Sequence, residues 1–256
     1  MKIITIGALK GGVGKTNFTF NLSCFLAIEK NKRILVIDLD PQGNLTQCFQ
    51  LDPIKSFASE LFLNENLKIK NIITSTDFEL ISIIPNNILM ADLEIKLSGE
   101  FGREHKFKNV IKNNMKYLQE NYDYILIDTN PSLNITNVNA YSSADSIILV
   151  SDNSVHSLRA LDTIYQMWNK ISKTIKVKNN IKAILLNNFD TFSISKDFKN
   201  YLEKSELVNL VINKEIRKKQ IFKNSEITGV PIIKIMKKDE NPYFNIVAEL
   251  AQKGVI

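Results

Sequence analysis

The chain has 256 residues and a formal net charge of +6, and this length suits one large domain that folds without disulfide bridges. Its two cysteines, Cys24 and Cys48, lack the spacing of a metal site or a C-x-x-C motif, which is typical of a reducing cytosol. No apolar run reaches the length of a membrane-spanning helix, and the first strand begins so early that we expect no signal peptide.

Apolar runs alternate with helical patterns along the chain. The predicted strands are residues 2–7, 33–38, 79–84, 122–128, 145–150 and 181–187, with a short last strand near 231–235. The predicted helices are residues 15–30, 106–120, 156–173, 195–204 and 242–253, and the polar region 52–78 is expected to form a short helix with loops. Several strands are nearly continuous Ile, Leu and Val, as in parallel sheets buried on both faces. The alternation predicts a single α/β domain over residues 1–256, with a doubly wound, mostly parallel sheet flanked by helices.

The segment between the first strand and the first helix carries the most informative motif. Residues 8–16 have the sequence Ala-Leu-Lys-Gly-Gly-Val-Gly-Lys-Thr. A strand, a glycine-rich loop and a helix in this order form the context that a phosphate-binding loop requires. Glycines let backbone N–H groups turn toward an anion, and the N-terminus of the helix adds positive potential. We expect Lys15 to contact the β- and γ-phosphates of a nucleotide, and the Thr16 hydroxyl to bind Mg²⁺.

This loop departs from the usual phosphate-loop spacing. Ala8 or Leu9 stands where the first glycine of G-x-x-x-x-G-K-[ST] is expected, and a second lysine, Lys10, begins the glycine run. The predicted nucleotide-binding residues of the loop are Lys10, Gly11, Gly12, Val13, Gly14, Lys15, Thr16 and Asn17.

Carboxylates follow two of the predicted strands. Asp38 and Asp40 lie at the end of strand 33–38 in the sequence Asp-Leu-Asp-Pro-Gln-Gly-Asn, and Asp128 ends strand 122–128. Ligands of open parallel sheets lie beyond the carboxyl ends of the strands, so we expect these carboxylates to face the phosphates. Carboxylates in such a position can hold Mg²⁺ or orient an attacking water.

Positive charge is concentrated in the last third of the chain. Residues 170–238 hold 16 basic and 6 acidic side chains, a local balance of +10, whereas the rest of the chain carries −4. Such asymmetry indicates a surface that faces a polyanion, although a set of solvated helix faces would give the same composition. The candidate residues of that surface, which the family resemblance described below implies to be DNA-binding, are Lys214, Arg217, Lys218, Lys219, Lys223, Lys234, Lys237 and Lys238.

The pattern K-G-G-x-G-K-[ST] at residues 10–16 resembles the deviant Walker A motif of the ParA/MinD family of ATPases. The resemblance implies an ATPase that uses ATP and Mg²⁺. It also implies that Lys10 is the signature lysine, which reaches across a dimer interface to the nucleotide of the partner subunit. Together with Lys15 and Asp40, Lys10 would form the catalytic set.

Two further segments carry this resemblance. The sequence from Asp38 to Asn44 resembles the family's switch I, which implies that Asp40 positions the hydrolytic water and that Asp38 supports the Mg²⁺ shell. Thr46 lies in the same switch. Asp128 matches the aspartate of the Walker B strand, which implies a Mg²⁺ ligand, but Asn130 stands where the family usually has proline.

The chain also departs from the family after later strands. Ser151-Asp152-Asn153-Ser154 stands where a Pro-Gln-Glu run often follows, so no role is assigned to this segment. After strand 181–187, the resemblance implies that Asn187 holds the adenine base, since its amide offers both a donor and an acceptor. Asn188 is the alternative, and an ordinary loop asparagine is the simpler reading.

The resemblance to ParA-type partition ATPases extends over nearly the full chain. It implies a cytoplasmic, nucleoid-associated protein that forms a homodimer on ATP binding, binds non-specific DNA and is stimulated by a ParB-like centromere-binding protein. A MinD-like membrane ATPase is the alternative, but helix 242–253 lacks the basic amphipathic pattern of a membrane-binding helix. An iron–sulfur reductase would need paired cysteines beyond the strands, and Asp40 argues against a nucleotide-binding scaffold without turnover.

Overall fold

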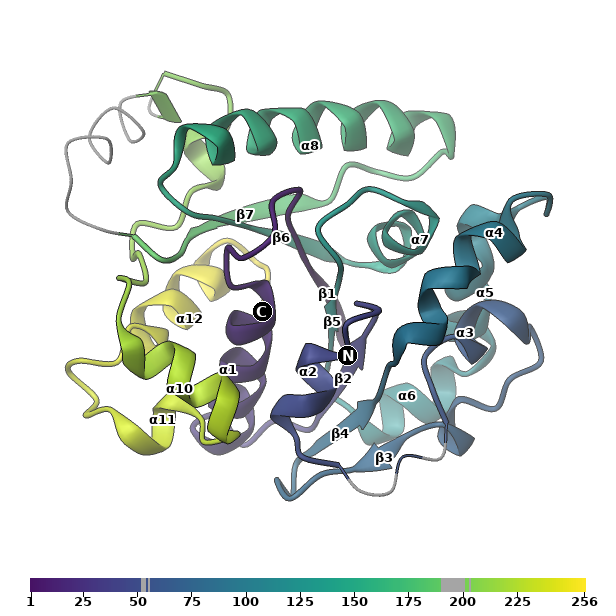
Figure 1. Ribbon diagram of the computed structural model, residues 1–256, viewed down its shortest axis with the longest axis horizontal. Helices are drawn as coiled ribbons and strands as arrows, with labels where there is room; N and C mark the ends of the chain where they lie inside the picture. Colours follow the sequence, from purple (N-terminus) through teal and green to yellow (C-terminus); the bar gives the residue numbers. More distant parts are fainter. Residues whose placement is uncertain (52–53, 55, 190–200, 203) are drawn as a thin grey trace.

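A seven-stranded sheet forms the centre of the described part of the chain in a computed structural model (Figure 1). The structure describes residues 1–51, 54, 56–189, 201–202 and 204–256. The strands are β1 (Lys2–Gly7), β2 (Ile34–Asp38), β3 (Thr74–Ser75), β4 (Ile81–Ile84), β5 (Tyr124–Asp128), β6 (Ser146–Ser151) and β7 (Ile181–Leu186). Their order across the sheet is β3-β4-β2-β5-β1-β6-β7, and only the β3–β4 pair is antiparallel. This order confirms the predicted doubly wound, mostly parallel sheet.

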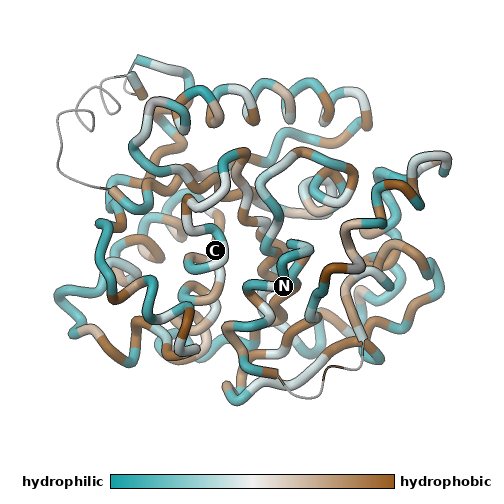
Figure 2. Tube along the Cα trace, in the orientation of Figure 1, coloured by the Kyte–Doolittle hydropathy of each residue, from teal (hydrophilic) through white to brown (hydrophobic). Residues whose placement is uncertain are grey.

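Continuous apolar runs place the central strands between two layers of helices. Every residue of β2 and β6 is buried, and the hydrophobic colours of Figure 2 follow the central strands. The register then sets the positions of the polar residues. Asp38 of β2 lies opposite Asp128 of β5, and Ile6 of β1 lies opposite Asp128 on its other side. The loops after β1, β2 and β5 therefore meet at one edge of the sheet.

Two hydrophobic cores lie on the two faces of the sheet. One face is covered by α1 (Lys15–Ile28), α2 (Asn44–Cys48), α10 (Gln220–Thr228), α11 (Ile232–Ile235) and α12 (Tyr243–Gln252). The other is covered by α3 (Glu60–Leu63), α4 (Leu93–Leu97), α5 (Lys106–Asn113), α6 (Met115–Asn121), α7 (Ile135–Ser143) and α8 (Val155–Thr174). Figure 1 shows α8 and the pair α1 and α12 on opposite sides of the strands. Short 3₁₀ helices are η1 (Ile69–Asn71), η2 (Ile88–Asp92), η3 (Arg103–His105) and η4 (Val208–Leu210).

The structure confirms the six long strands and the helices predicted at 15–30, 156–173 and 242–253, with small shifts at their ends. The strand predicted at 231–235 is wrong, since Ile232–Ile235 form α11, directly after Pro231, with Ile232 buried. Region 52–78 contains α3 and η1 as expected, and also the unpredicted strand β3. The helix predicted at 195–204 lies mostly outside the described residues.

The helix predicted at 106–120 is divided at Asn114 into α5 and α6. The Asn114 side-chain amide donates hydrogen bonds to the carbonyl oxygens of Leu67 (2.8 Å) and Val110 (2.9 Å). Asparagine side chains compete with the backbone for helical hydrogen bonds, which explains a break at this residue. Within the described ranges, no helix combines the length and the apolarity needed to cross a membrane.

Candidate functional site

A cleft of about 970 Å³ opens at the carboxyl edge of the sheet. Its walls come from six places in the chain: the loop between β1 and α1, the segment after β2, the segments after β5, β6 and β7, and the start of α10. This is the edge at which open parallel sheets bind their ligands. The fold therefore brings the predicted phosphate loop and Asp40 to one cavity, whereas Asp38 and Asp128 are buried and do not line it.

The phosphate loop closes tightly against the segment after β7. Gly14 precedes α1 in the left-handed conformation, with a φ of 86°. A Cβ atom at this position would lie 2.2 Å from Nδ2 of Asn187. Any side chain at residue 14 would be strained and would also collide with Asn187, so this glycine is required by both conformation and space.

Lys15 enters α1 with its side chain turned into the protein. It is 6% exposed, and burial lowers the pKa of its amine, while attraction to Asp128 and Asp40 partly offsets that effect. A buried cation between carboxylates and an open cleft is suited to meet phosphate oxygens.

Asp128 is fully buried at the end of β5. Burial raises the pKa of its carboxyl to about 8, with a further contribution from the nearby Asp38. The Thr16 hydroxyl donates a hydrogen bond of 2.7 Å to Asp128 Oδ2. The structure therefore brings together the hydroxyl and the carboxylate that were predicted from separate parts of the sequence to bind Mg²⁺.

Asp38 is held by the segment that follows it, here called the switch segment (residues 38–46). Its Oδ2 atom accepts hydrogen bonds from the Thr46 N–H (2.9 Å) and hydroxyl (2.8 Å), and its Oδ1 atom accepts one from the Asp40 N–H (3.1 Å). Burial raises the pKa of Asp38 to about 6, and these hydrogen bonds oppose the rise. The carboxylate is thus oriented by protein donors and stands beside Asp128.

These residues suit Mg²⁺ only together with a nucleotide. Within residues 1–51, 54, 56–189, 201–202 and 204–256, no group of three or more His, Cys, Asp or Glu side chains is placed to hold a metal ion. Mg²⁺ commonly takes one or two protein oxygen ligands, with waters and phosphate oxygens completing its shell. The Thr16 hydroxyl and the Asp128 carboxylate match that donor set, because both are hard oxygen ligands, and Thr16, which lines the cleft, is hydrogen-bonded to the buried Asp128.

Lys10 is bound to its own chain. Its Nζ atom lies 2.6 Å from Asp152 Oδ2 and donates a second hydrogen bond of 2.9 Å to Ser154 Oγ. The other oxygen of Asp152 accepts hydrogen bonds from the Ser154 N–H (3.0 Å) and the Ser157 hydroxyl. Burial raises the pKa of Asp152, but the hydrogen bonds from Lys10, Ser157 and Ser154 outweigh it and hold the pKa below its ordinary value. Sequence reasoning assigned no role to Asp152.

Both asparagines after β7 line the cleft. Asn187 is buried and donates a hydrogen bond of 2.7 Å from Nδ2 to the carbonyl oxygen of Val13. Asn188 has a positive φ of 52° and places its Nδ2 atom 3.4 Å from the carbonyl oxygen of Gly12. Part of the Asn187 amide is therefore committed to the phosphate loop, which leaves the assignment of a base-binding asparagine as a prediction.

Asn17 turns its side chain toward α10. Its amide donates to the carbonyl oxygen of Phe222 and lies 3.4 Å from Glu226 Oε2. Asn17 still lines the cleft, so it links the first turn of α1 to α10 and places α10 beside the phosphate loop.

The candidate DNA-binding residues divide into groups. Lys218, Lys219 and Lys223 line the nucleotide cleft itself. Lys214, Arg217 and again Lys219 line a second cleft of about 410 Å³ beside it. The basic residues between 214 and 223 therefore line two clefts, in addition to any outer surface that they form.

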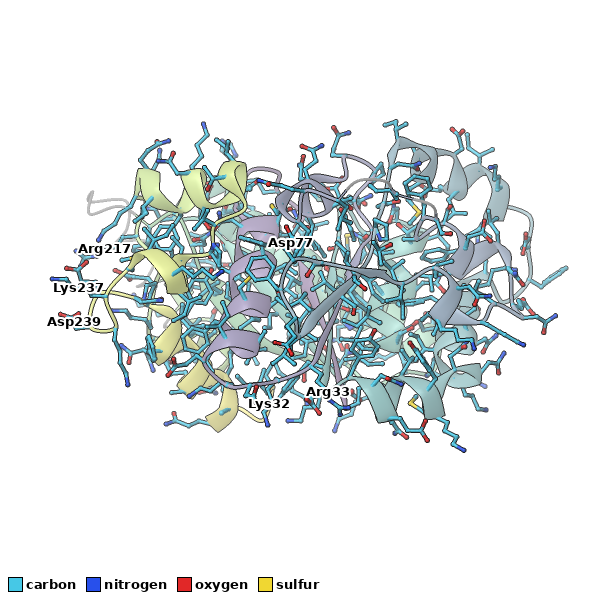
Figure 3. The ribbon with its side chains drawn as sticks, turned by 90° about the horizontal axis from the view of Figure 1, so that it is seen from below. Lys32, Arg33, Asp77, Arg217, Lys237 and Asp239 are labelled. Atoms are coloured by element: carbon cyan, nitrogen blue, oxygen red, sulfur yellow. The ribbon has the colours of Figure 1, made fainter. Side chains whose placement is uncertain are left out.

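The remaining candidates lie further along the chain. Lys234 places its Nζ atom 5.0 Å from the centre of the Phe78 ring, and Lys238 lies 5.1 Å from the Phe244 ring. Lys237 is exposed. Figure 3 shows Arg217 and Lys237 along the same outer edge of the molecule, with Asp239 close to Lys237.

Asn86 is a site residue that sequence reasoning missed. It follows β4 after one intervening residue, is buried and contacts the switch segment through the side-chain amide and the backbone N–H. The sequence could have indicated this residue, because Asn86 lies just beyond the carboxyl end of a predicted strand, where open parallel sheets place their site residues.

Comparisons with known proteins show which chains this one resembles. A family model described as an AAA domain matches residues 1–183. The sporulation initiation inhibitor protein Soj of Bacillus subtilis is 28% identical, and the match covers 99% of each chain. A plasmid partition protein of Borrelia burgdorferi has a solved structure with a TM-score of 0.70 and 25% identity, which covers 92% of this chain and 99% of that one. A McdA variant from Cyanothece in complex with ATP has a TM-score of 0.85 at 20% identity, covers 98% and 96% of the two chains, and shows the shared fold.

Proposed function

This chain belongs to the AAA domain family and is a ParA-type ATPase, and we propose that it couples Mg²⁺-dependent ATP hydrolysis to the partition of DNA. One observation carries the proposal. Lys15 and Thr16 line a cleft that three lysines also line, and the Thr16 hydroxyl donates to the buried Asp128 carboxylate. ATP held in that cleft would lie beside a surface suited to a second polyanion.

In the proposed reaction, Lys15 and the N-terminus of α1 would bind the phosphates of ATP, and Thr16 and Asp128 would hold Mg²⁺. The metal ion, when bound, would neutralise charge on the phosphate oxygens. Asp40 lines the cleft and is 8% exposed, and we assign to it the orientation of the attacking water. The products would be ADP and phosphate.

Lys10 has a separate task in this proposal. It is tied to Asp152 within its own chain, and the ion pair is partly exposed, with 35% of the Lys10 side chain accessible. A pair of this kind is weak enough to exchange partners. ATP binding would therefore allow Lys10 to leave Asp152 and reach the nucleotide of a second copy, which would complete a homodimer.

The proposed dimer binds DNA without sequence choice. Lysine and arginine contacts to phosphates give binding that depends on salt and not on sequence. The eight candidate residues supply such contacts, and a ParB-like protein at a centromere site is the proposed stimulator of hydrolysis. The protein would then work in the cytoplasm, bound to the nucleoid.

The test is a set of ATPase and dimerisation measurements with non-specific DNA, with anionic liposomes and with neither. The proposal expects DNA to stimulate turnover and ATP to drive dimers that bind DNA. Stimulation by liposomes alone would contradict it and favour a MinD-like membrane ATPase. Asp40→Ala is expected to keep ATP-bound dimers on DNA, and wild-type turnover by this variant would remove Asp40 from the mechanism.

A further inference from the structure

Asn86 makes its hydrogen bonds to the switch segment from the end of the neighbouring strand. It is 3% exposed and follows β4 after Pro85. We propose that Asn86 is a positioning residue for ATP hydrolysis, which fixes the switch segment so that the Asp40 carboxylate faces the cleft. The inference rests on the proposed role of Asp40 in orienting the attacking water.

The first contact is to the backbone of Asp40 itself. The Asn86 side-chain Nδ2 donates a hydrogen bond of 3.0 Å to the Asp40 carbonyl oxygen. The same oxygen accepts a hydrogen bond of 2.9 Å from the Gly43 N–H. Since a carbonyl oxygen has two lone pairs, both are used, and the peptide after Asp40 is held from two directions.

The second contact runs through Thr46 to Asp38. The Asn86 backbone N–H donates a hydrogen bond of 2.9 Å to Thr46 Oγ1, and that hydroxyl donates one of 2.8 Å to Asp38 Oδ2. Because the hydroxyl oxygen accepts from Asn86, its hydrogen is directed to the carboxylate. Asn86 thus orients the side chain that holds the first aspartate of the switch segment.

The third contact is steric. Gly43 has a φ of 63°, and a Cβ atom there would lie 3.2 Å from the Asn86 carbonyl oxygen. The loop after Asp40 therefore packs directly on the Asn86 backbone. Asn86 therefore lies against the switch segment at Asp40, Gly43 and Thr46.

Asn86 is itself well anchored. β4 pairs with β2 along four residue positions, and the Pro85 carbonyl oxygen accepts a hydrogen bond of 2.8 Å from the Ala58 N–H. The Oδ1 atom of Asn86 is buried and has no hydrogen-bond partner among the described residues. A buried acceptor without a partner lowers the stability of a fold. Burial of the Asn86 amide is therefore best explained by its Nδ2 group, which donates to the Asp40 carbonyl oxygen.

Asn86→Ala tests the proposal, because it should slow ATP hydrolysis without weakening ATP binding. We expect kcat for ATP hydrolysis to fall about 10- to 100-fold, because a small displacement of a reacting group has effects of that order. The affinity for a fluorescent ATP analogue should stay within about twofold, since the described hydrogen bonds of Asn86 go to the switch segment and not to the phosphate loop.

Asn139→Ala is the matched control. The Asn139 amide is equally buried and donates to the carbonyl oxygens of Arg103 (2.7 Å) and Ile135 (2.9 Å), on the face of the sheet that α7 covers. This variant loses those two hydrogen bonds and a third, which Asn139 Oδ1 accepts from the Phe107 N–H (3.1 Å), so it is the more severe change and lies away from the cleft. We expect reduced thermal stability with kcat unchanged per folded molecule.

Asn86→Asp adds a signature that a merely structural role would not show. A protonated carboxyl at residue 86 can still donate to the Asp40 carbonyl oxygen, whereas an ionised one cannot. Turnover by this variant should therefore recover as the pH is lowered, relative to the wild-type protein at each pH. A pH profile parallel to that of the wild-type protein would overturn the proposal.

Asp40→Ala, measured alongside, separates the two hypotheses. If Asp40→Ala is inactive while Asn86→Ala turns over at the wild-type rate, or loses turnover only in proportion to ATP binding, the role of Asn86 is wrong and that of Asp40 stands. If Asp40→Ala turns over normally, the proposed role of Asp40 is wrong, and the inference on Asn86 is wrong with it.

Discussion

Lys15 is buried beside Asp128 and Asp40, and its attraction to these carboxylates partly offsets the effect of burial on its pKa. Lys15→Ala should weaken ATP binding by more than about 100-fold, because truncation of a buried charged partner costs at least 2–3 kcal/mol. Calorimetric titration with ATP measures the change, and Lys96→Ala, in an exposed part of α4, is the control. Unchanged affinity would contradict the phosphate-loop assignment.

Asp128 should make the stability of the nucleotide-free protein depend on pH. Its folded pKa of about 8 lies above its ordinary value of 3.8, mainly because of burial. The folded state therefore binds the proton more tightly, and this group makes stability fall as the pH rises between the two values. Asp128→Asn should gain stability relative to the wild-type protein from about pH 5 to pH 8. Thermal unfolding without metal checks this, and a constant difference across that range would contradict it.

The ion pair between Lys10 and Asp152 should oppose dimerisation if Lys10 has to leave it. Partly exposed pairs are worth about 0.2–1 kcal/mol each, and a symmetric dimer would break two of them. Asp152→Asn should therefore lower the protein concentration at which ATP-bound dimers form by about two- to thirtyfold. Sedimentation with ATP measures this shift. Asp145→Asn is not a suitable control, because the Asp145 carboxylate accepts a hydrogen bond from the Ile3 N–H. Asp162→Asn, at a solvent-exposed position of α8, serves instead. A weaker dimer would show that Asp152 supports the interface.

At the scale of elements, α10 and the segment before it connect the nucleotide cleft with the proposed DNA-binding surface. Lys218, Lys219 and Lys223 line the nucleotide cleft. Their replacement by Glu should weaken binding of ATP as well as DNA, because all three new carboxylates would face the phosphates.

A second triple variant separates the two effects. Lys234, Lys237 and Lys238 do not line that cleft, so their replacement by Glu should weaken DNA binding about tenfold or more while ATP affinity stays unchanged. Filter binding with DNA and titration with ATP compare the two variants. Equal loss of ATP affinity in both would show that the effect is one of general charge.

Elements with strong apolar periodicity could be predicted from the sequence, and those shaped by tertiary contacts could not. The buried strands and α8 were found because their patterns are local. Helix α7 was missed because Ile135–Ser143 is rich in Asn, Ser and Thr, which are weak helix formers. The segment Ile232–Ile235 was predicted as a strand because a short apolar run of Ile residues follows Pro231. Such a run does not show whether tertiary packing will make it a strand or a helix, and here it forms α11.

The same division applies to the site. The phosphate loop and the aspartates stand in local motifs, so their convergence followed from the rule on strand ends. The partners of those residues come from distant parts of the chain, as Asp152 does for Lys10 and Asn86 for Asp40. No spacing in the sequence encodes these pairs, because the crossover connections of the sheet bring them together.

For the whole molecule, the proposed dimer makes a prediction about salt. The slope of log affinity against log salt concentration reports the number of phosphates that a protein contacts. Two copies of the basic region in an ATP-bound dimer should give a slope about twice that of the ADP-bound protein. DNA binding at several salt concentrations measures both slopes. Equal slopes would contradict DNA binding by a dimer with both basic regions engaged.

Both borders of the sheet are occupied by the chain's own backbone. β3 is two residues long and lies antiparallel to β4. At the other border, the segment 211–218 runs beside β7, with Ile212 donating to the Ile184 carbonyl oxygen and Ile216 to that of Leu186. Among the described residues, little unpaired strand remains at these borders with which another chain could pair. Short or covered borders are how proteins avoid sheet-to-sheet polymerisation. Any higher-order polymer of this protein would therefore be built through side-chain surfaces and not by pairing of new strands with the described borders of the sheet.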